Sequence, residues 1–147
     1  DDGRIAIAAL ALGLARACLE ASVDYARERT AFGRPIGANQ GVAFPLADLD
    51  VAVESSRLLV YTAARLRDAG ADPAEVSRAA ARAKLYATEA AVSATRTATQ
   101  VFGGYGFIEE YPVARFYRDA KILEVGEGTS EVQRMVIARR IGAVPGK

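Results

Sequence analysis

The sequence has 147 residues, of which 51% are hydrophobic, and a formal net charge of +1, so it can form one domain with a sizeable core. The small net charge gives no reason to expect a nucleic-acid partner. Because the chain has no histidine, it lacks the usual general base and the usual zinc ligand, and no metal site is expected. Proton transfer would fall to Glu, Asp, Lys or Tyr, or to a bound cofactor.

The single cysteine, Cys18, excludes an internal disulfide and lies on an apolar helical stripe. It is expected to be a small buried residue in a reducing compartment, which favours a cytoplasmic location. Nothing at the N-terminus resembles a signal peptide, and the apolar run over residues 5–15 ends at Arg16, so no membrane span is expected. Because the chain opens almost directly into a helix, without an initiator methionine, we expect a domain of a longer protein.

The hydrophobic pattern predicts helices along the whole chain. Apolar residues recur at spacings of three and four over residues 4–29, which is typical of one helix face. A loop with two glycines, a proline and an asparagine follows at residues 30–40, and a second helix is predicted over residues 42–69. The inward-facing positions of this second helix are expected to be Leu46, Leu49, Val53, Val60 and Ala63.

A third helix is predicted to begin at Pro73, because Asp72 is a favoured N-cap and Glu75 can complete a capping box. Small residues repeat along one face of this helix, so neighbouring backbones could approach it closely and it should be central. These positions are Val76, Ala80, Ala83, Ala87, Ala90, Ala94, Thr97 and Val101. Glycines at 103, 104 and 106 end it, and shorter helices are predicted over residues 112–123 and from about residue 130.

These elements predict an all-α fold in one domain, residues 1–147. The expected architecture is an up-and-down bundle of three long helices plus a shorter C-terminal helix. Several helices are apolar on more than one side, which indicates that sister subunits or other domains cover them.

A carboxylate stands between two glycines just before the last predicted helix. Gly126 and Gly128 allow a ligand to approach the backbone, and Glu127 would lie on an exposed turn with its amide available. Ser130 and Gln133 have the spacing of a capping box and would start the helix. Taken alone, this stretch is better explained as a solvated glutamate favoured by the helix dipole.

Two other polar loops lie at predicted helix ends. In RERTAFGRPIGANQ, three arginines surround Phe32 and precede Gln40, a combination that suits a phosphate beside a stacked ring. A solvated basic helix end would have the same composition. In QVFGGYGF the glycines permit close approach to a ligand, but a helix stop needs no ligand, and without a preceding strand they are no Rossmann fingerprint.

Together, the segments RERTAFGRPIGANQ, QVFGGYGFIEEYPVARFYRDAKI and GEGTSEVQRMVIARRI resemble the C-terminal helical domain of the acyl-CoA dehydrogenases. The resemblance covers essentially the whole chain, from Gly3 and Arg4 onward. The family's N-terminal helical domain and central β-domain, which hold much of the flavin and thioester, are absent from this chain. The resemblance therefore implies that the parent protein is the enzyme and that the isolated chain has little activity.

The resemblance implies that Glu127 is the catalytic base. In this family, the glutamate before Gly-Thr removes the α-proton of an acyl-CoA thioester while the β-hydrogen leaves as hydride to flavin N5. The amide of that glutamate helps to hold the thioester oxygen. In some members the base comes instead from the residue before the arginine that opens the first helix; here this is Gly3, which cannot serve. Arg4 matches that arginine, which lies near the catalytic carboxylate and the acyl-CoA.

The resemblance also implies FAD as the cofactor and a homodimer or homotetramer as the assembly. Contacts with the FAD of a neighbouring subunit are matched by Arg29, Phe32, Ile36, Gln40, Gln100, Gly103 and Gly104. Contacts with the subunit's own FAD are matched by Thr129 and Glu131. Gly126 and Gly128 would border the acyl chain. The family commonly has tyrosine or phenylalanine at position 126, so glycine there removes a wall of the pocket and could admit branched or bulkier substrates.

The leading interpretation is an FAD-dependent acyl-CoA dehydrogenase that passes electrons to an electron-transfer flavoprotein. An acyl-CoA oxidase or a flavin monooxygenase of the same fold would use oxygen instead. Glu127 argues against a monooxygenase, which needs no such base, but does not separate an oxidase from a dehydrogenase. A non-catalytic helical association module is the third alternative.

Overall fold

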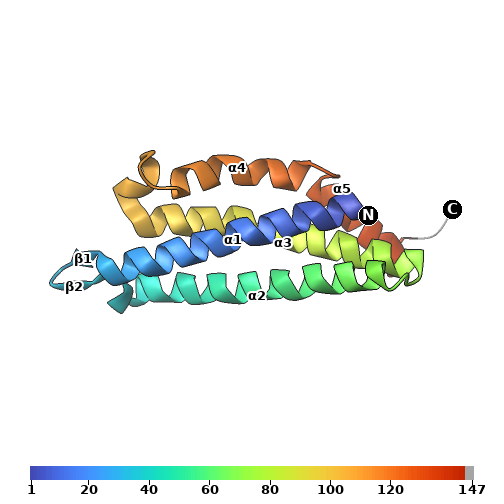
Figure 1. Cartoon of the computed structure of the whole chain (residues 1–147), viewed down its shortest axis with the longest axis horizontal. Coiled ribbons are helices and arrows are strands. Elements are labelled where there is room, and N and C mark those ends of the chain that lie inside the picture. The colour runs from blue at the N-terminus through green and yellow to red at the C-terminus, as the bar shows by residue number, and fades with distance from the viewer. Residues whose placement is uncertain (145–147) are drawn as a thin grey trace.

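The computed structural model describes residues 1–144, and most of them are helical (Figure 1). Three long helices, α1 (Asp2–Glu28), α2 (Gln40–Asp68) and α3 (Pro73–Phe102), run up and down beside one another. Two shorter helices follow, α4 (Val113–Val125) against α1 and α3, and α5 (Ser130–Arg140) against α3. The predicted all-α bundle is confirmed, and the predicted helix ends lie within two residues of the observed ones.

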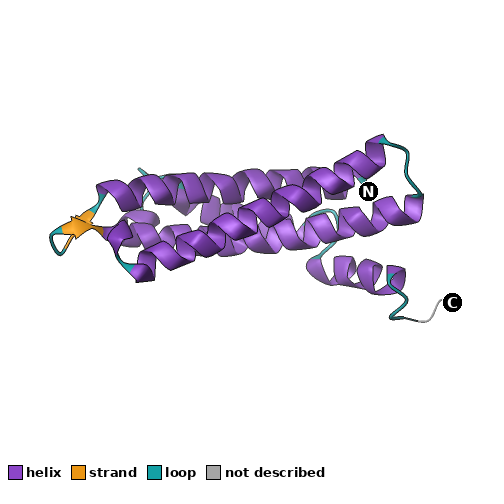
Figure 2. Ribbon diagram, turned by 90° about the horizontal axis from the view of Figure 1, so that it is seen from below, coloured by secondary structure: helices purple, strands orange, loops and turns teal. Residues whose placement is uncertain are grey.

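The predicted loop at residues 30–40 contains more structure than expected. Its strands β1 (Thr30–Ala31) and β2 (Arg34–Pro35) pair antiparallel, and the short 3-10 helix η1 (Ile36–Ala38) leads into α2. Phe32 and Gly33 make the turn with φ angles of 53° and 79°. Figure 2 shows this hairpin as the only strands drawn, at one end of the bundle. A second 3-10 helix, η2 (Gly103–Phe107), occupies the glycine-rich stop after α3.

The central position predicted for α3 is confirmed, because it packs against α1, α2, α4 and α5. Its buried face is mostly alanine, which lets the neighbouring backbones approach closely. Of the eight predicted small positions, Ala90 and Thr97 are half-buried and the others are buried. All five predicted inward-facing residues of α2 are buried.

The helix caps confirm one prediction and correct another. The Asp72 carboxylate accepts hydrogen bonds from the backbone N–H groups of Ala74 and Glu75, at 3.1 and 3.3 Å, as expected of an N-cap. At α5 the predicted cap was wrong by one residue. Thr129 is the N-cap, and its hydroxyl accepts from a backbone N–H at 3.3 Å. Gln133 does not cap the helix but is fully buried.

The helix α1 is apolar over most of its length. Its length and composition would allow it to cross a membrane, with a mean hydropathy of 1.7 over 18 residues. The expectation that Arg16 ends the apolar run too early for a span was therefore wrong as far as length and hydropathy are concerned. However, its alanine face packs in the core against α2 and α3, as does the core helix of a bundle. Cys18 on this face is 0% exposed, and burial raises the pKa of its thiol to about 12, which makes it unreactive at neutral pH.

Gly106 gives a test of how tightly η2 packs on α3. A β-carbon at Gly106 would lie 2.6 Å from the carbonyl oxygen of Thr99 and 3.1 Å from the β-carbon of Phe102. Because the first obstacle is backbone, Gly106→Ala is expected to destabilise the full-length protein by about 1–3 kcal/mol. Urea unfolding measures this change. Gly104→Ala is the control, because an added β-carbon there meets nothing within 4 Å, and equal stability of the two variants would contradict the packing.

Candidate active site

The residues predicted to form the site lie at the two ends of the bundle. Glu127 and its neighbours connect α4 to α5, close to the N-terminus of α1 (Figure 1, right). The hairpin, η1 and η2 lie at the opposite end (Figure 1, left). The 27 residues of α1 separate these ends by about 40 Å at 1.5 Å per residue. The chain therefore carries two separate groups of predicted ligand contacts.

Glu127 has a backbone conformation that is rare outside glycine. Its φ is 57°, and Gly128 follows with a φ of 94°, so the chain makes a left-handed turn between α4 and α5. The exposed Glu127 side chain reaches the first turn of α1. A β-carbon added to Gly3 would lie 2.2 Å from its Oε2 and 2.5 Å from its Cδ. The missing side chain at Gly3 thus provides the space that the carboxylate occupies.

Two buried side chains hold the loop that carries Glu127. Nζ of Lys84, on α3, donates hydrogen bonds to the carbonyl oxygens of Glu124 at 2.9 Å and Gly128 at 2.7 Å. Nε2 of Gln133, on α5, donates to those of Glu127 at 3.3 Å and Gly128 at 2.9 Å. Both side chains are 0% exposed. The carbonyl oxygens of the loop are therefore hydrogen-bonded to buried side chains of the domain. Within residues 1–144, no protein acceptor binds the Glu127 N–H.

Sequence reasoning missed both of these roles. The sequence pattern predicts a capping role for Gln133 and no role for Lys84. A signal was present, because Lys84 occupies a position among the small residues that predict the buried face of α3, and lysine is almost never fully buried without partners. Burial lowers the pKa of Lys84, and the negative charges of Glu124, Glu131 and Glu89 oppose that shift.

The side chain of Arg4 has a different partner from the expected one. Its Nη1 donates to the Asp1 carboxylate at 2.6 Å, and among residues 1–144 no ion pair joins it to Glu127. Arg4 follows Gly3 in the chain, so its backbone, but not its side-chain ion pair, lies near the Glu127 carboxylate. Its role in catalysis stays a prediction.

Thr129 and Glu131 lie directly after the base, at the start of α5. The pKa of Glu131 is lowered because its carboxylate accepts hydrogen bonds from its own backbone N–H and from the Thr129 side chain. Both residues belong to the exposed entrance of the helix, where amide groups favour negative charge.

The opposite end brings together segments that are distant in the sequence. A cavity of about 550 Å³ lies between α1, η1 and η2, and Arg29, Ile36, Gly103 and Gly104 line it. Gln100 lines two neighbouring cavities, one of them together with Gly103. Gln40 begins α2, directly before Gly41, which lines one of these cavities together with Gln100. Five of the seven predicted contacts at this end thus line one of these three cavities.

An aromatic cluster forms part of the lining of this cavity. Tyr25 of α1 stacks on Phe102 with ring centroids 4.1 Å apart, and Tyr111 meets both rings edge-on. Tyr105 of η2 contacts Tyr111, and the Arg29 guanidinium lies 5.7 Å from the Tyr105 ring centroid. Tyr105 and Tyr111 therefore take part in aromatic packing.

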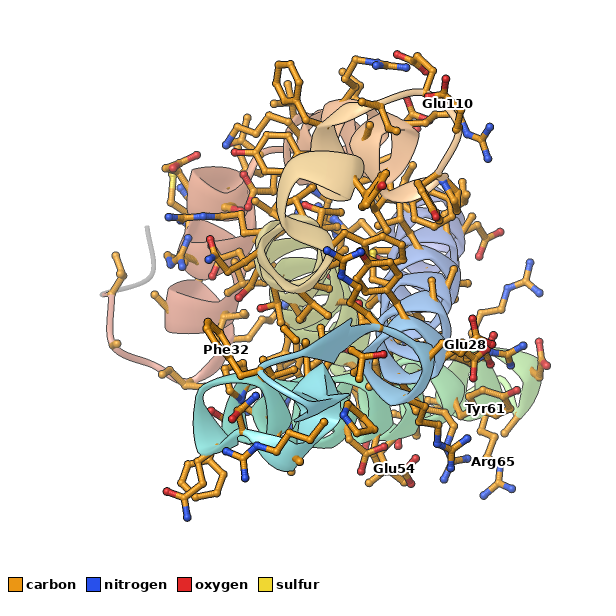
Figure 3. All side chains as sticks on the ribbon, turned by 90° about the vertical axis from the view of Figure 1, so that its left-hand side faces the viewer. Glu28, Phe32, Glu54, Tyr61, Arg65 and Glu110 are labelled. Atoms are coloured by element: carbon orange, nitrogen blue, oxygen red, sulfur yellow. The ribbon has the colours of Figure 1, made fainter. Side chains whose placement is uncertain are left out.

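Phe32 projects from the tip of the hairpin (Figure 3). Its side chain is fully exposed, at 101% relative accessibility, and its φ of 53° belongs to the turn. An aromatic ring held on a short hairpin without cover from its own chain is suited to contact another molecule. The exposed ring, the neighbouring arginines and the glycine-lined cavity fit the stacked ring and phosphates of a dinucleotide, as predicted for FAD.

The chain is similar in sequence to proteins of one known family. A family described as "Acyl-CoA dehydrogenase, C-terminal domain" matches residues 1–142. The chain is 52% identical over 141 residues to "Acyl-CoA dehydrogenase, short-chain specific" from Clostridium acetobutylicum, which covers 96% of this chain and 36% of that protein.

Two solved structures extend the comparison. Butyryl-CoA dehydrogenase from Megasphaera elsdenii is 46% identical with a TM-score of 0.90, over 94% of this chain and 35% of that chain. A structure described as "FAD complex of PigA" is 32% identical with a TM-score of 0.87, over 92% and 34%. The chain thus spans about a third of the length of the relatives it matches. Since the match includes both ends of the bundle and the Glu127 loop, the chain belongs to the acyl-CoA dehydrogenase family as its C-terminal domain.

Proposed function

We propose that this domain is the C-terminal part of an FAD-dependent acyl-CoA dehydrogenase in which Glu127 is the α-proton acceptor. The placement of Glu127 carries the proposal: its carboxylate lies against Gly3, and its N–H has no protein acceptor within residues 1–144. The carboxylate can take a proton from the α-carbon. The N–H can bind the thioester oxygen as that oxygen gains negative charge. One residue would therefore supply the base and part of the electrostatic stabilisation.

FAD, when bound, would accept the hydride that leaves the β-carbon. The bound FAD of a relative that is 32% identical supports this cofactor. The separation of the predicted contacts supports a homodimer or homotetramer. Thr129 and Glu131 would contact the FAD of their own subunit beside the base, while the cavity at Arg29 and the exposed Phe32 would contact the FAD of a neighbouring subunit.

The names of the relatives favour a short acyl chain, since one is short-chain specific and another acts on butyryl-CoA. An electron-transfer flavoprotein is proposed as the electron acceptor, and the cytoplasm as the location, where Cys18 would stay a thiol.

Flavin absorbance of the full-length protein tests this proposal. The protein is expected to be yellow, and anaerobic addition of butyryl-, octanoyl- or isobutyryl-CoA should bleach the flavin band for at least one of them. A colourless protein, or a flavin band that no acyl-CoA bleaches, would contradict the proposal. Peroxide formed in air as fast as the flavin is reduced would identify an oxidase of the same fold.

Gly126 is expected to set the width of the acyl pocket. Its φ of −62° and ψ of 148° suit any residue, and an added β-carbon meets only the Ile122 carbonyl oxygen at 3.4 Å. Gly126→Tyr should therefore fold and close one wall. We expect kcat/KM for isobutyryl-CoA to fall about 10-fold or more relative to butyryl-CoA. Gly126→Ala, which adds one methyl group, is the control, and an unchanged ratio in the tyrosine variant would place the pocket wall elsewhere.

A further inference from the structure

Lys84 is the only charged side chain that is fully buried in the part of the chain that the structure describes. Burying an ammonium is unfavourable unless hydrogen bonds replace its water. An apolar side chain of similar length would fill the same space without this cost. The presence of a lysine here therefore calls for a role that depends on its hydrogen bonds.

The acceptors of those hydrogen bonds lie on both sides of Glu127 in the chain. One acceptor, the carbonyl oxygen of Glu124, belongs to the last turn of α4, and the other, that of Gly128, directly follows Glu127. Carbonyls in the last turn of a helix have no partner within the helix, and a cation complements the negative end of its dipole. Lys84 thus caps α4 from a different helix and fixes the chain on both sides of Glu127.

The helix that carries Lys84 makes this anchor rigid. α3 packs against all four other helices, whereas Gln133 belongs to α5, which follows the loop and packs mainly on α3. Gln133 also binds the Gly128 carbonyl, but it is neutral and lies on the helix that begins directly after the loop. A non-glycine residue at a φ of 57° is held in an unfavourable conformation, which requires support from the surrounding structure.

We propose that Lys84 is a positioning residue for the base: from the central helix it binds the carbonyls of Glu124 and Gly128 and holds Glu127 in its left-handed conformation. This keeps the carboxylate against Gly3 and leaves the Glu127 N–H available. The inference rests on the proposed function for its catalytic consequence. Its structural part, the conformation of Glu127, can be tested without any reaction.

The structural test is a crystal structure of the full-length Lys84→Met variant. Methionine keeps the length and apolar bulk of the side chain but cannot donate to the carbonyls. We expect Glu127 to leave its positive φ and its carboxylate to move away from Gly3. The matched control is Lys121→Met, which removes an exposed lysine that pairs with the Glu124 carboxylate and leaves the carbonyl contacts intact. An unchanged Glu127 in Lys84→Met would overturn the proposal.

The kinetic test is anaerobic reduction of the bound flavin by butyryl-CoA. In Lys84→Met the limiting rate should fall roughly 30-fold or more, because displacing a reacting group by about 1 Å can cost 100-fold. The Kd for butyryl-CoA should change less than the rate, and Lys121→Met should match the wild type. In Lys84→Ala, propylammonium should restore part of the rate and 1-propanol should not. The alcohol carries no charge and has one donor hydrogen, whereas the ammonium binds two carbonyls. Equal rescue by the alcohol would show that an ammonium is not required and would overturn the proposal.

The outcomes separate this inference from the proposed function. A wild-type protein that holds FAD but is reduced by no acyl-CoA contradicts the proposed function, and the crystal structure of Lys84→Met then decides the role of Lys84 alone. If Lys84→Met does not fold, Lys84→Gln replaces it in both measurements, since glutamine is shorter and uncharged but keeps a donor. A wild-type loop and rate in that variant would overturn the need for an ammonium.

Discussion

Glu127→Gln is expected to abolish reduction of the flavin by acyl-CoA while the protein keeps its fold and its FAD. Glutamine has nearly the same shape as glutamate but cannot accept the α-proton. Losing a general base costs about 100- to 10,000-fold in rate. The loss should lie at the upper end of this range because the domain has no histidine that could replace the base. The side chain is exposed, so stability should change little.

Anaerobic stopped-flow absorbance at the flavin band measures this rate, and the flavin content after gel filtration shows whether the cofactor is retained. Glu20→Gln is the control, because Glu20 is an exposed carboxylate on α1 that pairs with Arg16. Retained reduction at the wild-type rate in Glu127→Gln would show that the base lies elsewhere.

Gly3→Ala is expected to slow flavin reduction by up to about 100-fold without loss of stability. The added β-carbon would lie 2.2 Å from Oε2 of Glu127, so the carboxylate must rotate away. That movement is possible because the obstacle is the far end of a flexible side chain. Alanine is favoured over glycine within a helix, which keeps the fold intact, whereas a misplaced base loses rate steeply.

The matched control lies on the same helix. At Gly13 an added β-carbon meets nothing within 4 Å, so Gly13→Ala should leave the rate unchanged and slightly raise the thermal midpoint. Rates and midpoints of the two variants are compared in the full-length protein. Wild-type reduction by Gly3→Ala would mean that Glu127 does not act from its position against Gly3.

Much of the fold follows from periodicity and capping. The buried residues of α2 and the cap at Asp72 were predictable because they depend on local spacing. The hairpin was not, since its strands contain two residues each and its turn places the non-glycine Phe32 at a positive φ. The cap of α5 was misplaced by one residue because Gln133, which suits a capping box, is instead needed in the core.

The residues of the candidate site that belong to a local sequence motif were predictable. The contacts between distant segments that position those residues were not. Glu127 stands out between its glycines, and the resemblance to a known family predicts its role as the base. The hydrogen bonds from Lys84 join residues 40 and 44 positions apart, a separation that no local pattern reports. The seat of the carboxylate against Gly3 depends equally on two distant segments meeting at one end of the bundle.

The rate of flavin reduction with deuterated substrate tests the central role of Glu127 most directly. Butyryl-CoA deuterated at the α-carbon is compared with unlabelled butyryl-CoA in anaerobic stopped-flow reduction of the full-length wild-type protein. Proton abstraction by Glu127 predicts a several-fold slower reduction with the deuterated substrate, and essentially no reduction of Glu127→Gln by either. Equal rates with the two substrates, together with normal reduction of Glu127→Gln, would contradict the assignment of Glu127 as the base.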